Sequence, residues 1–193
     1  MASLSRPRRH EVPADVFRNL RSVGGDLYRL GLVSSHGGNL SIRDGHSIWI
    51  TGTGMMLGHL EVEDISLVRP GGDYEGPPPS TDTVLHSAVY ALSDVGAIAH
   101  AHPRHATAIS MAQDRFEPED FEGQAFLGEV PICEAGPEQI AQIAQALSKR
   151  PAVLLRGHGA FASGGSLWEA LHWLTALEES AHISVIRRSL GPN

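Results

Sequence analysis

The stretch AIAHAHPRHATAIS, residues 97–110, is the first in the chain whose residue types and spacing could do chemistry, because it gathers three histidines. Side chains alternate between the two faces of a β-strand, so we expect His100 and His102 to point the same way. Pro103 should end that strand directly after the pair, and functional sites are commonly built where strands end. Two imidazoles at this spacing can reach one metal ion.

A third imidazole could come from the stretch LLRGHGAFA, in which His158 lies between Gly157 and Gly159 at the end of a predicted buried strand. Glycines permit a turn there and leave room for a ligand. Three histidines with an open fourth position form the ligand set of a catalytic zinc site, whereas structural zinc sites usually contain cysteine. The single cysteine, Cys133, excludes a multi-cysteine structural site. The pattern therefore predicts metal binding, with ordinary partly buried histidines bonded to backbone carbonyls as the alternative.

The remaining histidines do not complete this pattern. His105 follows in the next turn, where we expect it beside the site or on the surface. His86 lies four positions after Asp82 on one helical face, and packing is its expected role. His36 lies in a glycine-rich turn, where contact with a substrate is possible but a surface position is expected. The histidines with no constellation around them are His10, His46, His59, His172 and His182.

The stretch PPPSTDTVLH could bring an acid to the same place. Ser80, Thr81 and Asp82 stand at a predicted helix start, where capping alone would select these residue types. The glycine-rich turns SSHGGNLS and ITGTGM favour a further role, because such turns present backbone N–H groups to anions. Neither turn has the GK[ST] or G-x-G-x-x-G pattern of a nucleotide site. The combination fits a small phosphate ester bound beside a metal.

Composition indicates the class of molecule that carries these residues. The 193 residues are 41% hydrophobic and 19% charged, which is typical of a globular chain that buries its own core. The formal charge of −7 gives no footprint for nucleic acid, and no window has the roughly 18 apolar residues of a membrane span. No apolar segment follows the basic start, and one cysteine fits a reducing cytoplasm. We expect a single domain over residues 1–193, with residues 1–11 as a flexible N-terminus.

Hydrophobic periodicity and turn residues predict interleaved helices and strands. The expected helices cover residues 13–31, 80–94 with a hydroxyl cap, 105–112, 136–150 and 166–188 with a capping box from Ser166 and Glu169. The expected strands are a hairpin within 39–54, one strand within 61–68, one at 97–103, one after a loop within 116–132, and one buried strand at 152–162. This order predicts an α/β or α+β class, with one sheet and helices on its faces.

Seven segments, taken in order, make the sequence similar to the class II aldolase/adducin family. They are GLVSSHGGNLSI, ITGTGM, LEVEDISLV, PPSTDTVLHSAVY, VGAIAHAHPRHATAIS, EVPI and LLRGHGAFASGGSLWEALHWLTALEESA. They extend over about residues 12–188, and the ordered set is far more specific than any one segment. The resemblance implies a three-layer α/β/α fold around a mainly antiparallel sheet. It also implies a homotetramer with zinc near the subunit interface.

The resemblance also implies roles for individual residues. His100, His102 and His158 match the family's zinc ligands, which leaves His105 outside the ligand set. Asp82 matches the catalytic acid/base of the aldolases. The family's phosphate-binding groups are matched by Asn39, Thr53, Gly54, Ser80 and Thr81. The implied reaction cleaves a small ketose 1-phosphate, such as L-fuculose 1-phosphate, to dihydroxyacetone phosphate and an aldehyde through a zinc-stabilised enediolate.

Three departures from the aldolase pattern leave other reactions open. Family aldolases usually carry glutamate where this chain has Asp82, whereas the 4-epimerases carry aspartate. The acidic residue that the epimerases use before the VPI-like strand corresponds to Gln124. Both groups use a tyrosine in a C-terminal tail, and the tyrosines of this sequence are Tyr28, Tyr74 and Tyr90. A sugar-phosphate 4-epimerase or a decarboxylase on the same zinc site is therefore the alternative. A non-catalytic adducin-like module is less favoured, because the metal histidines are retained.

Overall fold

The structure is a computed structural model, and it describes residues 11–191. The predicted flexible N-terminus falls on residues 1–11, of which 1–10 lie outside the described residues. The helices are α1 Ala14–Arg29, α2 Thr83–Leu92, α3 Arg104–Ala112, α4 Phe121–Phe126, α5 Gln139–Leu147 and α6 Leu167–Ser189, with short 3₁₀ turns at Leu57–His59 and Val62–Asp64. The strands are β1 Asn39–Asp44, β2 Ser47–Thr51, β3 Ile65–Val68, β4 Tyr74–Glu75, β5 Ala97–Ala101, β6 Arg115–Phe116, β7 Val130–Cys133, β8 Ala152–Leu155 and β9 Gly159–Gly164.

Within residues 11–191 the strands form one nine-stranded sheet in the order β4-β3-β2-β1-β5-β9-β8-β7-β6. Every neighbouring pair is antiparallel except β7 and β8, which pair in parallel. Short turns suffice for antiparallel neighbours, whereas the parallel pair needs the crossover helix α5 between its strands. The predicted α/β class with a mainly antiparallel sheet is confirmed.

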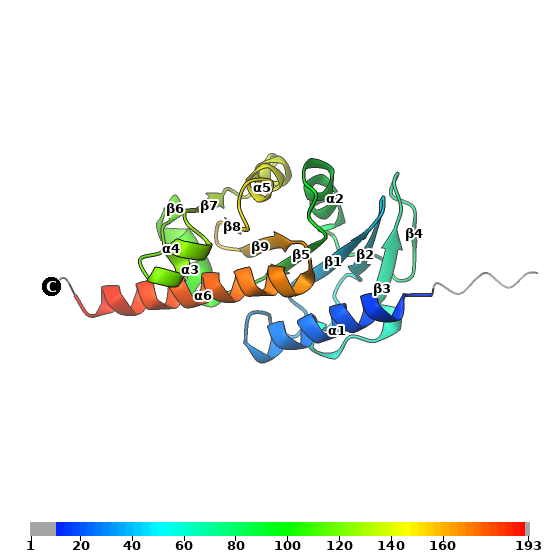
Figure 1. The fold of residues 1–193 in the computed structure, drawn as a ribbon, viewed down its shortest axis with the longest axis horizontal. Coiled ribbons are helices and arrows are strands. Elements are labelled where there is room, and N and C mark those ends of the chain that lie inside the picture. The colour runs from blue at the N-terminus through cyan, green and yellow to red at the C-terminus, as the bar shows by residue number, and fades with distance from the viewer. Residues whose placement is uncertain (1–10, 192–193) are drawn as a thin grey trace, which may run out of the picture.

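Helices cover both faces of the sheet, which gives three layers (Figure 1). On one face α2 and α5 pack against each other and contribute Leu85, Val89, Ile143 and Leu147 to a core that includes Ile98 of β5. On the other face α1, α3 and α6 cover the sheet with a second core, whose central side chains include Leu20, Leu27, Ile109, Leu174 and Leu177. The helix α4 packs on α6. None of the helices among the described residues is long and apolar enough to cross a membrane.

Local signals explain most of these elements. Gly45 adopts φ +58° in the β1–β2 turn, as the predicted Asp-Gly hairpin requires. At the start of α6 the Ser166 hydroxyl accepts a bond from the Glu169 N–H at 3.3 Å, as predicted. In a capping box the Glu169 carboxylate would accept from the N–H of Ser166. Here it accepts instead from the N–H of Gly165, one residue earlier, at 2.7 Å.

Three expected elements differ from the structure. Residues 152–162 form two antiparallel strands, β8 and β9, because the chain reverses at Gly157, which has φ +67°. The loop within 116–132 contains the short strand β6 and the six-residue helix α4, too short for a periodic signal, which Asp120 caps through the Gly123 N–H at 2.8 Å. The helix predicted from residue 80 begins at Thr83, and its N-cap is Asp82 rather than a hydroxyl.

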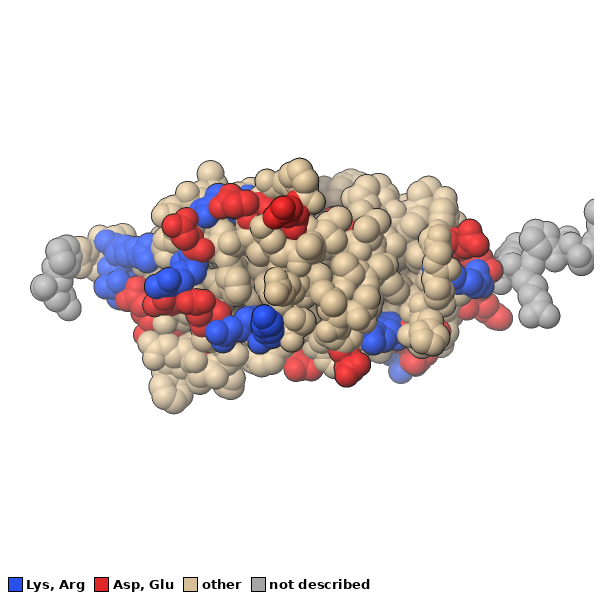
Figure 2. Space-filling view, turned by 90° about the horizontal axis from the view of Figure 1, so that it is seen from above, with Lys and Arg blue, Asp and Glu red and all other residues tan. Residues whose placement is uncertain are grey.

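The face that carries α2 and α5 has mixed charge (Figure 2). Lysine and arginine side chains lie near aspartate and glutamate toward the two ends of the molecule and along one edge, and uncharged residues cover most of the middle. Elsewhere on the surface, Arg187 of α6 pairs with Glu119, and Arg115 of β6 pairs with Glu117. Exposed ion pairs of this kind add little to the stability of the fold.

Candidate metal centre and active site

The three predicted metal ligands converge at one end of the β5–β9 pair. His100 lies in β5, His102 follows directly after it, and His158 lies in the turn that precedes β9. The Nε2 atom of His100 lies 3.1 Å from Nε2 of His102 and 3.1 Å from Nε2 of His158. Zn–N bonds of about 2.0–2.1 Å in a tetrahedron would hold two ligand nitrogens roughly 3.3 Å apart. The donor set therefore fits a single divalent transition-metal ion with one side left open.

The surroundings of His100 hold its imidazole neutral and correctly oriented. Its Nδ1 lies 2.9 Å from the carbonyl oxygen of Ala160, and because a carbonyl only accepts, Nδ1 must donate. That tautomer leaves the Nε2 lone pair facing the other two rings, an arrangement typical of metal-ligating histidines. Burial, reinforced by His102, lowers the pKa of His100 to about 3. A neutral imidazole is the form that binds a metal.

His102 lies between two glycines, and sequence reasoning did not assign this role to either of them. A Cβ atom on Gly37 would lie 2.8 Å from His102 Nδ1, and one on Gly159 would lie 2.7 Å from His102 Cδ2. The sequence pattern predicts a turn at Gly159 and an anion-binding turn at Gly37. The signal in the sequence that could have revealed these contacts is that Gly37 and Gly159 each directly follow a histidine, His36 and His158. Only residues without a side chain allow the backbone to approach the ring this closely.

Asp82, the predicted acid/base, does not cap its own helix although it occupies the N-cap position of α2. Its Oδ2 accepts a hydrogen bond from Nδ2 of Asn39 at 2.7 Å. Asn39 pairs with His100 in the β1–β5 register, so its amide holds the carboxylate at the strand next to that of a predicted metal ligand. Burial lowers the pKa of His102 and His158 lowers it further, whereas the nearby charge of Asp82 opposes this shift. The capping explanation is therefore wrong for the side chain, whose charge lies beside the histidines.

Four of the residues predicted to bind phosphate, Thr53, Gly54, Ser80 and Thr81, lie on two adjoining segments. The fifth, Asn39, lies at the start of β1, where its amide is bonded to Asp82. The Ser80 N–H donates to the Thr51 carbonyl at 3.1 Å, and the Thr53 N–H donates to the Pro78 carbonyl at 2.9 Å. The Thr53 hydroxyl donates to the Pro79 carbonyl at 2.7 Å. Ser80 is buried, whereas the exposed members are Thr53, Gly54 and Thr81. These contacts bring the ITGTGM turn beside the start of α2, and phosphate binding there stays a prediction.

Several of the other histidines are engaged elsewhere, and His10 lies outside the described residues. His105 lies 2.8 Å from Oε1 of Glu178 through Nδ1, and its ring stacks on His182 at 4.1 Å between centroids. His86 is fully buried and bonded to the Ser41 hydroxyl at 2.7 Å, which confirms a packing role. His36 is exposed, as expected. Sequence reasoning missed Glu178, which also accepts from the first backbone N–H groups of α3.

A hollow of about 500 Å³ lies between the β1–β2 hairpin and α2, next to Ile48, Val68 and Tyr90. Its lining includes none of the predicted site residues and is mostly apolar, so we assign the site from the histidine geometry and not from this hollow. Cys133 is buried in the core that α2 and α5 share, and burial, reinforced by the charge of Glu134, raises the pKa of its thiol.

Residues 18–185 match the family described as Class II Aldolase and Adducin N-terminal domain. The crystal structure of L-fuculose-1-phosphate aldolase from Thermus thermophilus is similar, with TM-score 0.85 and 38% identity, and the match covers 94% of this chain and 100% of that one. An L-fuculose phosphate aldolase of Methanococcus maripaludis is 31% identical over 85% of this chain and 93% of its own. A methylthioribulose-1-phosphate dehydratase of Granulibacter bethesdensis is 34% identical over 83% of this chain and 86% of its own. The chain therefore belongs to the class II aldolase and adducin family and is an enzyme of the lyase type.

Proposed function

We propose that this enzyme is a zinc-dependent aldolase that cleaves a small ketose 1-phosphate, such as L-fuculose 1-phosphate, to dihydroxyacetone phosphate and an aldehyde. The observation that carries the proposal is the convergence of three imidazole Nε2 atoms, 3.1 Å apart in two pairs, beside a carboxylate that does not cap its own helix. Two relatives named as L-fuculose phosphate aldolases support the same substrate class.

The chemistry follows from the residues around this cluster. A zinc ion held by His100, His102 and His158 would supply the Lewis acid for the carbonyl and hydroxyl oxygens of the substrate. In the cleavage direction the C3–C4 bond breaks, the C4 hydroxyl loses its proton as the aldehyde forms, and the C3 carbon gains one. We assign the transfer at C3 to the Asp82 carboxylate, which the Asn39 amide orients. The segments around Thr53 and Ser80 would hold the phosphate and so align the reacting carbons.

Other lyase or isomerase reactions on the same site are the alternative. Asp82 in place of glutamate favours a 4-epimerase by resemblance, and a relative at 34% identity is named as a dehydratase. Decarboxylation of a 3-oxo acid phosphate would need the same metal cluster but no proton transfer to dihydroxyacetone phosphate. The retained histidines and Asp82 argue against a non-catalytic adducin-like role.

The test is hydrogen exchange at the hydroxymethyl carbon of dihydroxyacetone phosphate in deuterated water, followed by NMR with zinc-loaded protein. An aldolase removes one proton from that carbon, which becomes C3 of the ketose, and returns a deuteron, so we expect exchange that stops when the metal is chelated. Asp82→Asn should retain zinc and lose exchange by about 10²- to 10⁴-fold, the usual contribution of a general acid/base. Zinc-loaded wild type without exchange would overturn the aldolase and direct the substrate search to pentulose phosphates, 3-oxo acids and dehydration substrates.

We further propose a homotetramer in the cytoplasm. The assembly is inferred from the family resemblance, and the reducing compartment from a single buried thiol, Cys133. Light scattering on purified protein would test the assembly, because a tetramer has four times the mass of the 20.7 kDa chain.

A further inference from the structure

The helix α3 lies between the two segments that carry the metal ligands. It begins at Arg104, two residues after His102, and its last turn reaches the β8–β9 turn that carries His158. The first turn of α3 is held by Glu178 of α6, whose carboxylate accepts from the backbone N–H groups of His105 and Ala106 at 3.1 Å. A carboxylate at a helix N-terminus stabilises it through both hydrogen bonds and the helix dipole. Both ends of α3 are therefore tied to the fold.

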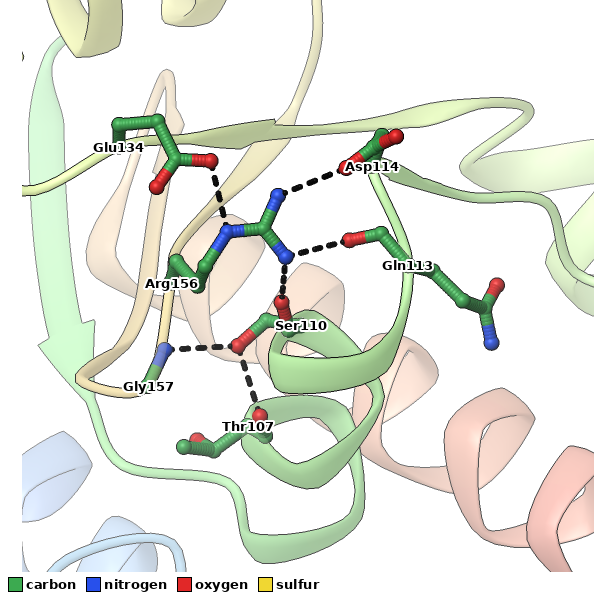
Figure 3. Close-up of polar contacts among 7 residues, drawn as sticks. All are labelled: Thr107, Ser110, Gln113, Asp114, Glu134, Arg156 and Gly157. Atoms are coloured by element: carbon green, nitrogen blue, oxygen red, sulfur yellow. Dashed lines mark hydrogen bonds and ion pairs between the residues drawn. The ribbon is translucent and has the colours of Figure 1, made fainter.

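The end of α3 is bonded to Arg156, which lies two residues before His158 (Figure 3). One guanidinium nitrogen, Nη1, donates to the carbonyl of Gln113 at 2.7 Å and also to the carbonyl of Ser110. The last carbonyls of a helix have no partner within the helix, so a cation placed there satisfies them and interacts favourably with the dipole. Arg156 is therefore a C-terminal cap for α3 that comes from the β8–β9 turn.

Two carboxylates complete the surroundings of Arg156. Glu134 accepts from Nε at 2.7 Å, and Asp114 accepts from Nη2 at 3.1 Å. Asp114 is fully exposed, so its ion pair adds little. The Arg156 side chain itself is only 24% exposed. The Glu134 side chain is 65% exposed as well, so we attribute most of the hold on Arg156 to its two carbonyl bonds (Figure 3).

Ser110 supplies a second tie between α3 and the turn. Its hydroxyl accepts from the Gly157 N–H at 2.9 Å and donates to the Thr107 carbonyl at 2.7 Å (Figure 3). Ser110 is fully buried, so water cannot replace these bonds. Gly157 has φ +67°, a conformation that L side chains rarely adopt, so the turn needs the glycine and the hydroxyl together.

His158 depends on these ties more than the other two ligands do. His100 is buried and His102 is half-buried, whereas His158 is exposed. Its exposed ring contacts those of His100 and His102, at 5.1 and 5.2 Å between centroids, so the position of its Nε2 atom relative to theirs follows the backbone of the turn. The backbone N–H groups of residues 156–158 are all hydrogen-bonded. The Arg156 N–H donates to the Cys133 carbonyl, the Gly157 N–H to the Ser110 hydroxyl and the His158 N–H to the Leu155 carbonyl.

We propose that Arg156 and Ser110 are positioning residues that fix the turn of His158 against α3 and thereby set the affinity of the three-histidine site for a divalent transition-metal ion. The inference rests on the proposed metal-dependent function. A turn released from α3 would sample more conformations. Metal binding would then have to order the turn and His158, and that loss of conformational freedom would lower the affinity. Substitution of residues that orient metal ligands typically weakens metal affinity by about 10–100-fold.

The test measures Zn²⁺ affinity by competition with a chromogenic chelator, and the visible spectrum of the Co²⁺-loaded protein. Ser110→Ala and Arg156→Gln should each weaken Zn²⁺ binding by about 10–100-fold, with Arg156→Lys between Arg156→Gln and wild type. The matched controls are Ser184→Ala, a buried hydroxyl on α6 that lacks a hydrogen bond in the described residues, and Arg115→Gln, an exposed cation on β6. Both controls should bind Zn²⁺ as wild type does. If Arg156→Gln fails to fold, the Ser110→Ala result decides.

A double-variant comparison separates positioning from general stability. If the two residues act through His158, Arg156→Gln and Ser110→Ala should not weaken the residual Zn²⁺ affinity of His158→Ala any further. Equal losses in both backgrounds, or unchanged affinity in the single variants, would overturn the inference while leaving the metal site intact. Wild-type protein that binds neither Zn²⁺ nor Co²⁺ would instead overturn the proposed metal-dependent function, and the inference with it.

Discussion

Asn39 donates a hydrogen bond from Nδ2 to Oδ2 of Asp82 across 2.7 Å, and this bond joins β1 to the start of α2. Asn39 is buried, and in the part of the chain that the structure describes its Oδ1 lacks a hydrogen-bond partner. An unpaired buried acceptor is costly, so the amide orientation is maintained by what its nitrogen gains from the carboxylate. Asp82 therefore accepts its hydrogen bond from the Asn39 amide rather than from the N–H groups at the start of α2.

We expect Asn39→Ala to lower kcat by about 10–100-fold, because Asp82 would be released from its orientation and could turn to cap α2. Zinc content should stay stoichiometric, since the three histidines are untouched. Steady-state kinetics together with metal analysis checks both statements. Normal turnover in this variant would show that Asp82 does not need the amide.

Removal of one ligand should weaken zinc binding enough that no stoichiometric zinc survives purification, and the stability that bound metal contributes should be lost with it. His102→Ala should bind no stoichiometric zinc, and its melting temperature should not respond to a chelator. Wild type should lose about 2.7 kcal/mol of stability when metal at 100 times its Kd is chelated. His59→Ala is the control, since His59 is exposed and lies outside the histidine cluster. A His102→Ala protein that still binds zinc tightly would exclude His102 as a ligand.

The three-histidine cluster could be predicted from the sequence because each of its residues carries a local signal. His100 and His102 are two positions apart before a proline, and His158 is flanked by glycines. The structure brings them together because β5 and β9 are neighbours, with Ala101 opposite Ala160. Their role as ligands is what the zinc measurements above decide.

Other features depend on how distant segments dock, and local patterns do not record this. Asn39 and Asp82 are 43 positions apart, and their bond requires α2 to pack against the end of β1. Arg156 lies 43 positions from Gln113, whose backbone carbonyl could belong to any residue type. The β8–β9 reversal escapes prediction because both strands are buried along their whole length, which makes residues 152–162 resemble one continuous buried strand.

A methyl group at residue 159 should disturb the metal site, because it would press on the ring of His102 and on the backbone of β5. In Gly159→Ala the new Cβ would lie 2.4 Å from the Ala101 carbonyl oxygen and 2.7 Å from His102 Cδ2, so backbone or ring must move. Overpacking of this kind costs about 1–3 kcal/mol of stability, and we expect weaker zinc binding as well. Denaturant unfolding and chelator competition measure the two effects.

The control for this substitution is Gly165→Ala, because a Cβ there would meet only Glu169 Oε2 at 3.4 Å, an ordinary contact. Its stability and zinc affinity should stay close to those of wild type. Gly159→Ala protein with wild-type zinc affinity would show that the ring of His102 can move without loss of the site.

His86 should make the metal-free protein sensitive to mild acid. Burial lowers its pKa from 6.5 to about 3, with Asp82 opposing the shift. Below pH 6.5 the unfolded chain binds a proton at this histidine and the folded chain does not, so the free energy of unfolding falls as the pH drops toward 3. This stability is present above the unfolded pKa, and it is lost at up to about 1.4 kcal/mol per pH unit between the two pKa values.

We expect His86→Gln to reduce that slope by up to one proton between about pH 6 and about pH 4.5, whatever it does to stability at neutral pH. Urea unfolding of the chelator-treated protein across this range provides the slope, and it separates the proton linkage from metal release. His46→Gln is the matched control, because His46 lies exposed in the β1–β2 turn and is hydrated in both states. An equal slope for wild type and His86→Gln would mean that the imidazole takes up its proton in the folded protein as well, which the fully buried ring and its bond to Ser41 argue against.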